Sequence, residues 1–226
     1  MVYQRLNFRR FFNYFLPGAC YLCRNTINEQ ALICADCRQD LPRNYHACDP
    51  HGRAQATIID QVIAPYAYRF PVNKLIRQLK YNQKISLAHA FGLDITDDIL
   101  KVCTSLPDCI LPVPLHRRRQ LARGYNQAEE IARTVARELS VPLNSALLYR
   151  SRNTLAQFDL SPAARRRNIQ GAFKLRAAPA YKSVAIIDDV ITTGVTVTEV
   201  ARLLKRAGVK RVEAWACART PPHGPG

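Results

Sequence analysis

Residues 184–196, VAIIDDVITTGVT, join an apolar strand, two adjacent acids and a loop of threonines around a glycine. The β-branched apolar run at the start is typical of a buried parallel strand. Asp188 and Asp189 are predicted to end this strand, and the loop after them leads into a helical pattern. In an open parallel sheet ligands bind beyond the carboxyl ends of the strands, so the segment predicts a ligand site.

The loop has the composition of a phosphate cradle. A helix that starts there offers backbone N–H groups and the positive end of its dipole, and Gly194 lets the backbone approach a ligand closely. Thr192, Thr193 and Thr196 add hydroxyl donors. The acids cannot face a phosphate, but they can accept hydrogen bonds from two adjacent sugar hydroxyls. A ribose 5-phosphate would suit both the loop and the acid pair. Each of these residues alone is also common in turns and helix caps.

The charge of the chain is strongly positive. Its 226 residues include 33 Lys and Arg against 17 Asp and Glu, a formal net charge of +16. Such an excess predicts attraction to phosphates, nucleic acids or anionic membrane surfaces. No apolar run approaches the roughly 20 residues that span a bilayer. The N-terminal segment has too short an apolar core for a signal peptide, so we expect a cytoplasmic protein without membrane insertion.

Eight cysteines in a reducing compartment favour metal binding or buried thiols over disulfides. Two CxxC pairs separated by ten residues form a strong zinc signal, and four thiolates make a closed structural site; the predicted ligands are Cys20, Cys23, Cys34 and Cys37. His46, Cys48 and His51 could complete a second site only with Asp49 or a partner chain, so we expect one zinc per chain. Three further cysteines in apolar contexts are expected to be buried thiols: Cys103, Cys109 and Cys217.

Helical and strand patterns alternate along the rest of the chain, which predicts a parallel α/β sheet. Helical spacing marks NKLIRQLK, ISLAHAFGLDITDDILKVC, NQAEEIARTVAREL and TVTEVARLLKRAG, and strands are expected at CILPVPL and RVEAWACA. Asn126 and Glu129 form a candidate capping pair. We expect a lead-in at residues 1–16, a zinc module at 17–55, the main domain at 56–220 and a disordered tail at 221–226.

The segment VAIIDDVITTGVT resembles the phosphoribosyl-pyrophosphate (PRPP) binding motif of type I phosphoribosyltransferases. From residue 17 to about 220 the chain resembles the ComF/GntX family, in CYLCRNTINEQALICADC, LPVPLHRRRQLARGYNQAEEIA and RSRNTLAQFDLSPAARRRNIQGAF. The resemblance implies a zinc-ribbon module before a phosphoribosyltransferase domain that binds PRPP with Mg²⁺. It implies that Asp188 and Asp189 hold the ribose hydroxyls as the catalytic acids. The PRPP-binding residues would be Asp188, Asp189, Thr192, Thr193, Gly194, Val195 and Thr196.

Two arginine-rich stretches are expected near this site. The first follows the strand ILPV, and guanidinium groups suit pyrophosphate oxygens. Its candidates are Arg117, Arg118, Arg119, Arg123 and Gly124, the last two matching the family's RG-aromatic-NQ core, while a solvated basic loop is the alternative. Residues 150–173, with Arg165, are expected to form a lid over the ligand. With Tyr149 and Phe158 nearby, this stretch could equally follow single-stranded nucleic acid.

Two functions follow from these patterns. The favoured hypothesis is an enzyme that transfers the ribosyl phosphate of PRPP to an acceptor, in DNA uptake (competence) or nucleobase salvage. The alternative is a non-catalytic competence factor that senses PRPP or binds single-stranded DNA, with other DNA-uptake proteins as partners. No segment shows a base-selecting pattern, so the acceptor and the oligomeric state are not predicted.

Overall fold

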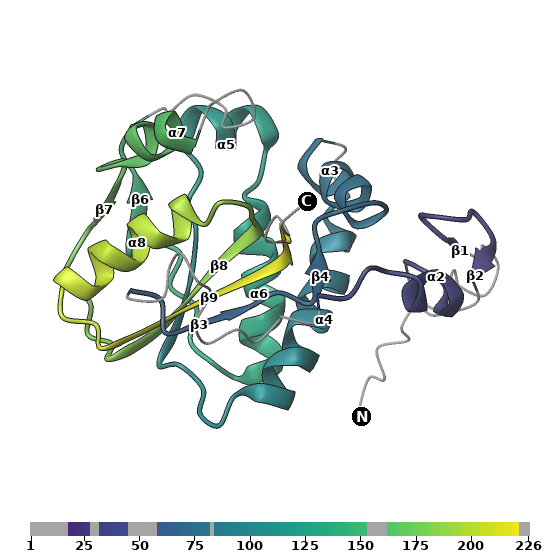
Figure 1. Ribbon diagram of the computed structural model, residues 1–226, viewed down its shortest axis with the longest axis horizontal. Helices are drawn as coiled ribbons and strands as arrows, with labels where there is room; N and C mark the ends of the chain where they lie inside the picture. Colours follow the sequence, from purple (N-terminus) through teal and green to yellow (C-terminus); the bar gives the residue numbers. More distant parts are fainter. Residues whose placement is uncertain (1–17, 28–31, 45–57, 82–83, 153–161, 222–226) are drawn as a thin grey trace, which may run out of the picture. The chain divides into compact units, whose positions relative to one another are not determined.

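A computed structural model of the chain describes residues 18–27, 32–44, 58–81, 84–152 and 162–221 (Figure 1). They belong to two compact units, one ending at Leu41 and the other beginning at Pro42. The predicted lead-in at residues 1–16, the predicted module boundary near residue 55 and nearly all of the predicted tail lie outside the described residues.

The first unit is built from short elements. Strands β1 (Gly18–Ala19) and β2 (Thr26–Ile27) pair in antiparallel fashion, and helix α2 (Ala35–Gln39) follows them. Cys34 caps this helix, because its thiol accepts a hydrogen bond from the backbone N–H of Cys37. The unit therefore places cysteines at the turn between its strands and at the start of its helix.

The second unit contains a parallel sheet in the order β3-β9-β8-β5, which confirms the predicted α/β class. Its strands are β3 (Gln61–Ile63), β9 (Arg211–Arg219), β8 (Ser183–Ile191) and β5 (Cys109–Pro112). A short strand, β4 (Tyr66–Ala67), continues the pairing of β9 beyond β3. The predicted strand that carries the two acids is thus β8, which lies between β9 and β5.

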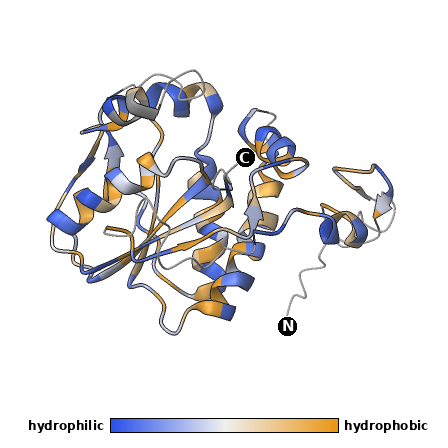
Figure 2. Cartoon of the chain, viewed as in Figure 1, coloured by the Kyte–Doolittle hydropathy of each residue, from blue (hydrophilic) through white to orange (hydrophobic). Residues whose placement is uncertain are grey.

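Helices cover both faces of this sheet. Alternate residues of β8 and β9, such as Val184 and Val212, pack in one apolar cluster with α8 (Val195–Arg206). The intervening residues, such as Trp215, are also fully buried, and α4 (Ser86–Val102) and α6 (Gln127–Leu139) contact the strands there. Figure 2 shows the resulting apolar strands at the centre and helices that are apolar on one side only. The predicted helices over these segments are confirmed.

The smaller elements lie outside the sheet. They are α3 (Val72–Tyr81), α5 (Arg117–Arg123), β6 (Leu148–Arg150), α7 (Pro162–Ile169) and β7 (Phe173–Leu175), with β6 and β7 paired antiparallel. Three of them, α3, α5 and β6, contribute residues to a pocket at the carboxyl ends of the sheet's strands. The first arginine-rich stretch forms helix α5, so the alternative of a solvated basic loop is wrong. His116 caps it by accepting a hydrogen bond from the backbone N–H of Arg118 at 3.3 Å, and Gly124 ends it with φ +85°.

Two further details differ from the sequence expectation. Strand β8 runs on to Ile191, so the acid pair lies inside the strand and not at its end. The amide side chain of Asn126 caps α6 by accepting from the backbone N–H of Ala128, as expected. Glu129 bonds to Arg133 at 2.6 Å and does not close a capping box. Among the described helices, none is both long and apolar enough to cross a membrane.

Candidate active site

A pocket of about 550 Å³ opens at the carboxyl ends of β5 and β8. Its wall includes the whole segment from Asp188 to Val197, with one side formed by α5 and the start of α6. Lys80 and Tyr81 at the end of α3, together with Arg150 at the end of β6, complete it. The structure therefore brings every predicted PRPP-binding residue, from Asp188 to Thr196, to one cavity.

The two acids point to opposite faces of β8 although both line the pocket. By strand alternation Asp188 follows Val184 and Ile186 on the α8 side, whereas Asp189 follows Ala185 and Ile187 on the α6 side. Asp188 Oδ1 accepts a hydrogen bond from the backbone N–H of Asp189 at 2.8 Å. Burial and the neighbouring Asp189 carboxylate raise the pKa of Asp188 to about 7, against the opposing effects of Lys80 and Arg150.

Asp189 is held by two side chains from different helices. Lys80 Nζ lies 2.9 Å from Oδ1, and Gln127 Nε2 donates to Oδ2 at 2.9 Å. Burial alone would lower the pKa of Lys80, but the Asp189 carboxylate outweighs it, and Asp188 adds to the effect, so the pKa is raised. Lys80 is therefore a charged partner of the acid pair from a distant part of the chain.

The threonine loop leads directly into the first turn of α8. Gly194 caps this helix with φ +69°, a left-handed conformation that residues with a Cβ rarely adopt. Thr192 and Thr193 are exposed in the pocket wall, and Val195 and Thr196 already belong to the helix. The geometry supports an anion site, because first-turn N–H groups of a helix lack intrahelical acceptors and carry the positive dipole end.

Two of the arginines of helix α5 line the pocket. Arg119 and Arg123 are four residues apart and share one side of the helix, and both line the cavity. Arg117 and Arg118 are exposed and are not lining residues, and neither is Gly124. The Arg123 guanidinium lies over the ring of Tyr81, 5.3 Å from its centroid.

Arg150 is the member of the second arginine stretch that reaches the pocket. Burial, with a contribution from nearby Arg119, lowers its pKa to about 10, while Asp188 acts in the opposite direction. Arg165 lies in helix α7, but its side chain is outside the described part of the structure, as are residues 153–161 with Phe158. The predicted lid and its contacts therefore stay a prediction.

Lys80 and Gln127 were not singled out in the sequence, although Lys80 left a signal there. The buried side of α3 contains Val72 and Ile76, and Lys80 continues this spacing of four residues. A lysine on an apolar stripe indicates a buried charge partner. Gln127 gave no comparable signal, because a glutamine in the first turn of a helix is ordinary.

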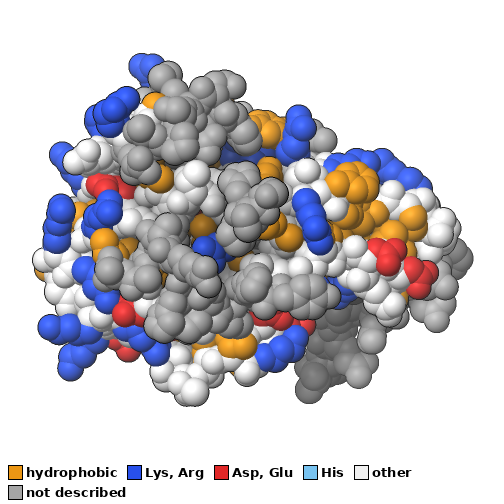
Figure 3. Space-filling view, in the orientation of Figure 1, with side chains coloured by type: hydrophobic (Ala, Val, Ile, Leu, Met, Phe, Trp, Pro, Cys, Tyr) orange, Lys and Arg blue, Asp and Glu red, His pale blue; other side chains and the backbone are white. Residues whose placement is uncertain are grey.

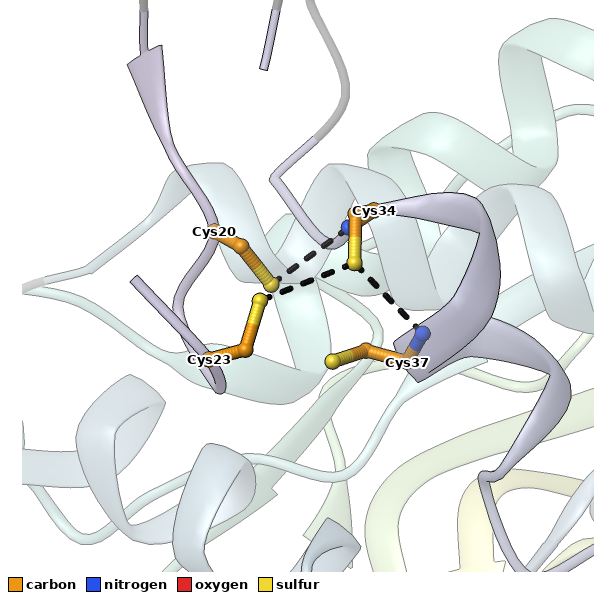
Figure 4. Close-up of side chains that lie close together, drawn as sticks. All are labelled: Cys20, Cys23, Cys34 and Cys37. Atoms are coloured by element: carbon orange, nitrogen blue, oxygen red, sulfur yellow. Dashed lines mark hydrogen bonds between the residues drawn. The ribbon is translucent and has the colours of Figure 1, made fainter. Parts of the chain in front are cut away.

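The four cysteines of the first unit form one cluster (Figure 4). One ligand atom of each lies within 4.8 Å of the others: Cys20, Cys23, Cys34 and Cys37. Burial would raise the pKa of Cys20, but hydrogen bonds from the backbone N–H groups of Cys34, Cys23 and Leu22 outweigh it and lower the pKa to about 6. The neighbouring thiols raise the pKa of Cys37 to about 12, so the geometry and not the ionisation indicates the metal: four converging thiols match the tetrahedral set that zinc prefers.

Three further cysteines in the described part of the main unit are single thiols. Cys109 and Cys217 are buried as expected, whereas Cys103 is only half-buried, because it follows the end of α4 at the edge of the helix layer. His46, Cys48, Asp49 and His51 lie outside the described residues, so the prediction of one zinc is not tested by this geometry.

Comparison with known families divides the chain in the same way as the motifs. Residues 126–224 match the phosphoribosyl transferase domain family, and residues 11–65 match the double zinc ribbon domain family. The first match contains the acid pair, the threonine loop and Gln127. The second contains all four clustered cysteines.

Several proteins are similar over nearly the whole chain. The DNA utilization protein YhgH of Escherichia coli O157:H7 is 33% identical over 213 residues, which cover 90% of this chain and 91% of that protein. Competence protein F of Haemophilus influenzae is 32% identical over 209 residues, covering 89% and 90%. Competence protein ComFC of Bacillus subtilis is 24% identical over 200 residues, covering 84% and 78%.

Proposed function

This chain belongs to the family of competence protein F and the YhgH DNA utilization proteins, and from that premise we propose that its pocket binds PRPP with Mg²⁺. We further propose that it transfers the ribosyl phosphate to an acceptor during the uptake or use of DNA, or in nucleobase salvage, in the cytoplasm. One observation carries the proposal: a single cavity joins the acid pair, the threonine loop at the start of α8 and three arginines.

The parts of the pocket suit the parts of PRPP. The loop from Thr192 to Thr196 would hold the 5-phosphate, and the acids would accept hydrogen bonds from the ribose hydroxyls. Arg119, Arg123 and Arg150 would face the pyrophosphate, where guanidinium groups stabilise the charge that develops as it leaves. Mg²⁺ favours oxygen ligands and commonly binds through substrate phosphates, so it would arrive on the pyrophosphate. When bound, it would neutralise the leaving group.

Calorimetric titration with Mg–PRPP tests the binding site. Asp188→Asn combined with Asp189→Asn removes two charged acceptors, each worth about 1.5–3 kcal/mol, so the affinity should fall by about 100-fold or more. The chain offers a matched control in another adjacent acid pair, Asp97→Asn with Asp98→Asn on α4, which should bind like the wild type. Unchanged affinity in the Asp188/Asp189 variant would refute the assignment. A pyrophosphate-release assay with a panel of nucleobases then tests transfer, which loss of Arg123 should slow.

A second candidate function, binding of single-stranded DNA, is favoured by a surface on α3. Phe70 and Tyr81 are 73% and 63% exposed, and a groove between them is lined by Asn73, Lys74, Arg77 and Gln78. Exposed aromatic rings beside cations are the elements that stack bases and follow a phosphate backbone. Tyr81 also lines the pocket, so the groove adjoins it. Tyr149, the aromatic residue expected in this role, is only half-exposed, with Arg176 over its ring.

Fluorescence anisotropy with a labelled single strand tests this surface. Phe70→Ala with Tyr81→Ala removes two stacking platforms and should weaken binding by about 10-fold or more. Lys74→Ala with Arg77→Ala should reduce the slope of log K against log salt by about 1.4, since each phosphate contact contributes about 0.7. Leu100→Ala, an exposed apolar residue on α4, is the control. Equal affinities in all variants would place the DNA elsewhere or exclude this function.

A further inference from the structure

The two acids differ in their contacts, because only Asp189 is bound by side chains of other elements on both of its carboxylate oxygens. Asp189 receives Lys80 Nζ on Oδ1 and Gln127 Nε2 on Oδ2, each at 2.9 Å. Its side chain is only 8% exposed. The hydrogen bond that Asp188 accepts is the local one from the backbone N–H of Asp189. A carboxylate held from two helices has one position, whereas a neighbour held only by its own strand can rotate toward a ligand.

Lys80 reaches this position because of where α3 ends. Helix α3 is fixed in the core by the buried side chains of Leu75, Ile76 and Leu79. Its last turn therefore places the Lys80 side chain at the carboxyl end of β8. The side chain is 16% exposed, and a lysine so deep in a protein requires a charged partner. Asp189 supplies that partner.

We propose that Lys80 is the positioning residue of the acid pair: it fixes Asp189 as a carboxylate and leaves Asp188 to adjust to the ribose. The inference rests on the proposed PRPP function and deepens it. Two adjacent carboxylates repel each other, and Lys80 reduces the net charge of the pair to that of one acid. Each oxygen of Asp189 has a second lone pair, so the gripped carboxylate can still accept a hydrogen bond from a sugar hydroxyl.

A purely structural ion pair is the alternative explanation of the same contact. Lys80 and Asp189 would then only attach α3 to the sheet, and buried pairs of this kind are weak evidence for stability. The two explanations differ in what Lys80 does for PRPP binding. A positioning residue changes the PRPP affinity through Asp189, whereas a mechanical link changes only the stability of the fold. A titration of Asp188 first shows whether the Lys80 charge acts on the pair.

The first arm of the test is therefore a ¹³C-carboxyl NMR titration of Asp188 without ligand. The charged groups that face Asp188 are Asp189 on its own strand, Lys80 on α3 and Arg150 on β6. Because the Lys80 cation favours the ionised form, Lys80→Met should raise the pKa of Asp188 further above about 7. Lys80→Arg keeps the charge and should restore the wild-type titration. Lys101→Met, an exposed lysine on α4, is the control.

The second arm measures PRPP affinity in a double-mutant cycle. Lys80→Met should weaken binding by about 10- to 100-fold, because without the cation one acid of the pair takes up a proton and one charged hydrogen-bond acceptor is lost. In an Asp189→Asn background the same change should have little further effect, because Lys80 acts through Asp189. If Lys80→Met fails to fold, the Lys80→Met/Asp189→Asn variant removes the unpaired buried charge and can be compared with Asp189→Asn alone.

The outcomes separate the two proposals. An unchanged Asp188 titration in Lys80→Met would overturn the role of Lys80. So would a cycle in which Lys80→Met weakens PRPP binding by the same factor in the wild-type and the Asp189→Asn background. Wild-type protein that fails to bind PRPP would overturn the proposed function, while the ligand-free titration would still decide whether Lys80 controls the acid pair.

Discussion

At the scale of single residues, the ionised form of Asp188 destabilises the ligand-free fold. Its carboxyl group is half-buried beside another carboxylate, and both effects raise its pKa to about 7 from an ordinary value of 3.8. Between those values the folded chain holds a proton that the unfolded chain has lost. Stability therefore falls as the pH rises through this window, from about 4 to about 7, and stays low above it.

We predict that Asp188→Asn stabilises the ligand-free protein at pH 8. The amide oxygen can still accept from the backbone N–H of Asp189, and no charge has to be buried. A gain of about 1 kcal/mol would raise Tm by about 2–4 °C, and it should shrink toward pH 4, where the aspartate is protonated in the fold. Scanning calorimetry at several pH values measures this. Asp97→Asn is the control, and a lower Tm at pH 8 than the wild type would contradict the raised pKa.

The residues of the site were predictable from sequence to different degrees. The motif from Asp188 to Thr196 could be found because its residues are contiguous in the chain. Lys80 lies more than a hundred positions away, and only the fold brings α3 to β8. Its place on an apolar helical stripe indicated a buried charge, but nothing in the sequence identified Asp189 as its partner.

At the scale of elements, α5 was not predicted although its composition favours a helix. A solvated basic loop was the alternative for the segment RRRQLAR, yet Arg, Gln, Leu and Ala are all good helix formers. The sequence also contains the residues that cap its two ends, His116 and Gly124. Helical spacing then determines which arginines face the pocket, a question that a loop leaves open.

The cysteine cluster belongs to the same scale, because its ligands come from a turn and a helix start. We predict one zinc per chain, held by Cys20, Cys23, Cys34 and Cys37, and needed for the fold of the first unit. Zinc binding to such sites contributes about 10–16 kcal/mol in small metal-folded peptides. Elemental analysis of the purified chain checks the count, and Cys34→Ser should abolish it.

Cys103→Ser, which changes a half-buried thiol outside the cluster, should leave the zinc content at one. Two zincs per chain would mean that His46, Cys48 and His51 also bind metal. A chain without zinc would refute the module itself.

At the scale of the whole molecule, the class of the sheet was predictable and the order of its strands was not. Apolar β-branched runs alternating with helical patterns indicate parallel strands. The order β3-β9-β8-β5 depends instead on which strands bury which faces, and β9 lies between strands from distant parts of the sequence. The positive charge is likewise visible in composition alone, whereas Figure 3 shows that Lys and Arg side chains are spread over the visible face.

The pairing of β3 with β9 also limits how early the sheet can form during translation. Asp60, just before β3, accepts a hydrogen bond from the backbone N–H of Val212, 152 positions later in the chain. A ribosome that adds about 5–20 residues per second needs on the order of 10 s to make the intervening segment. Throughout that interval β3 has no strand neighbour, and β8 has only β5 beside it when it emerges. The ligand pocket is thus assembled late in translation, and the nascent chain depends until then on protection of its bare strand edges.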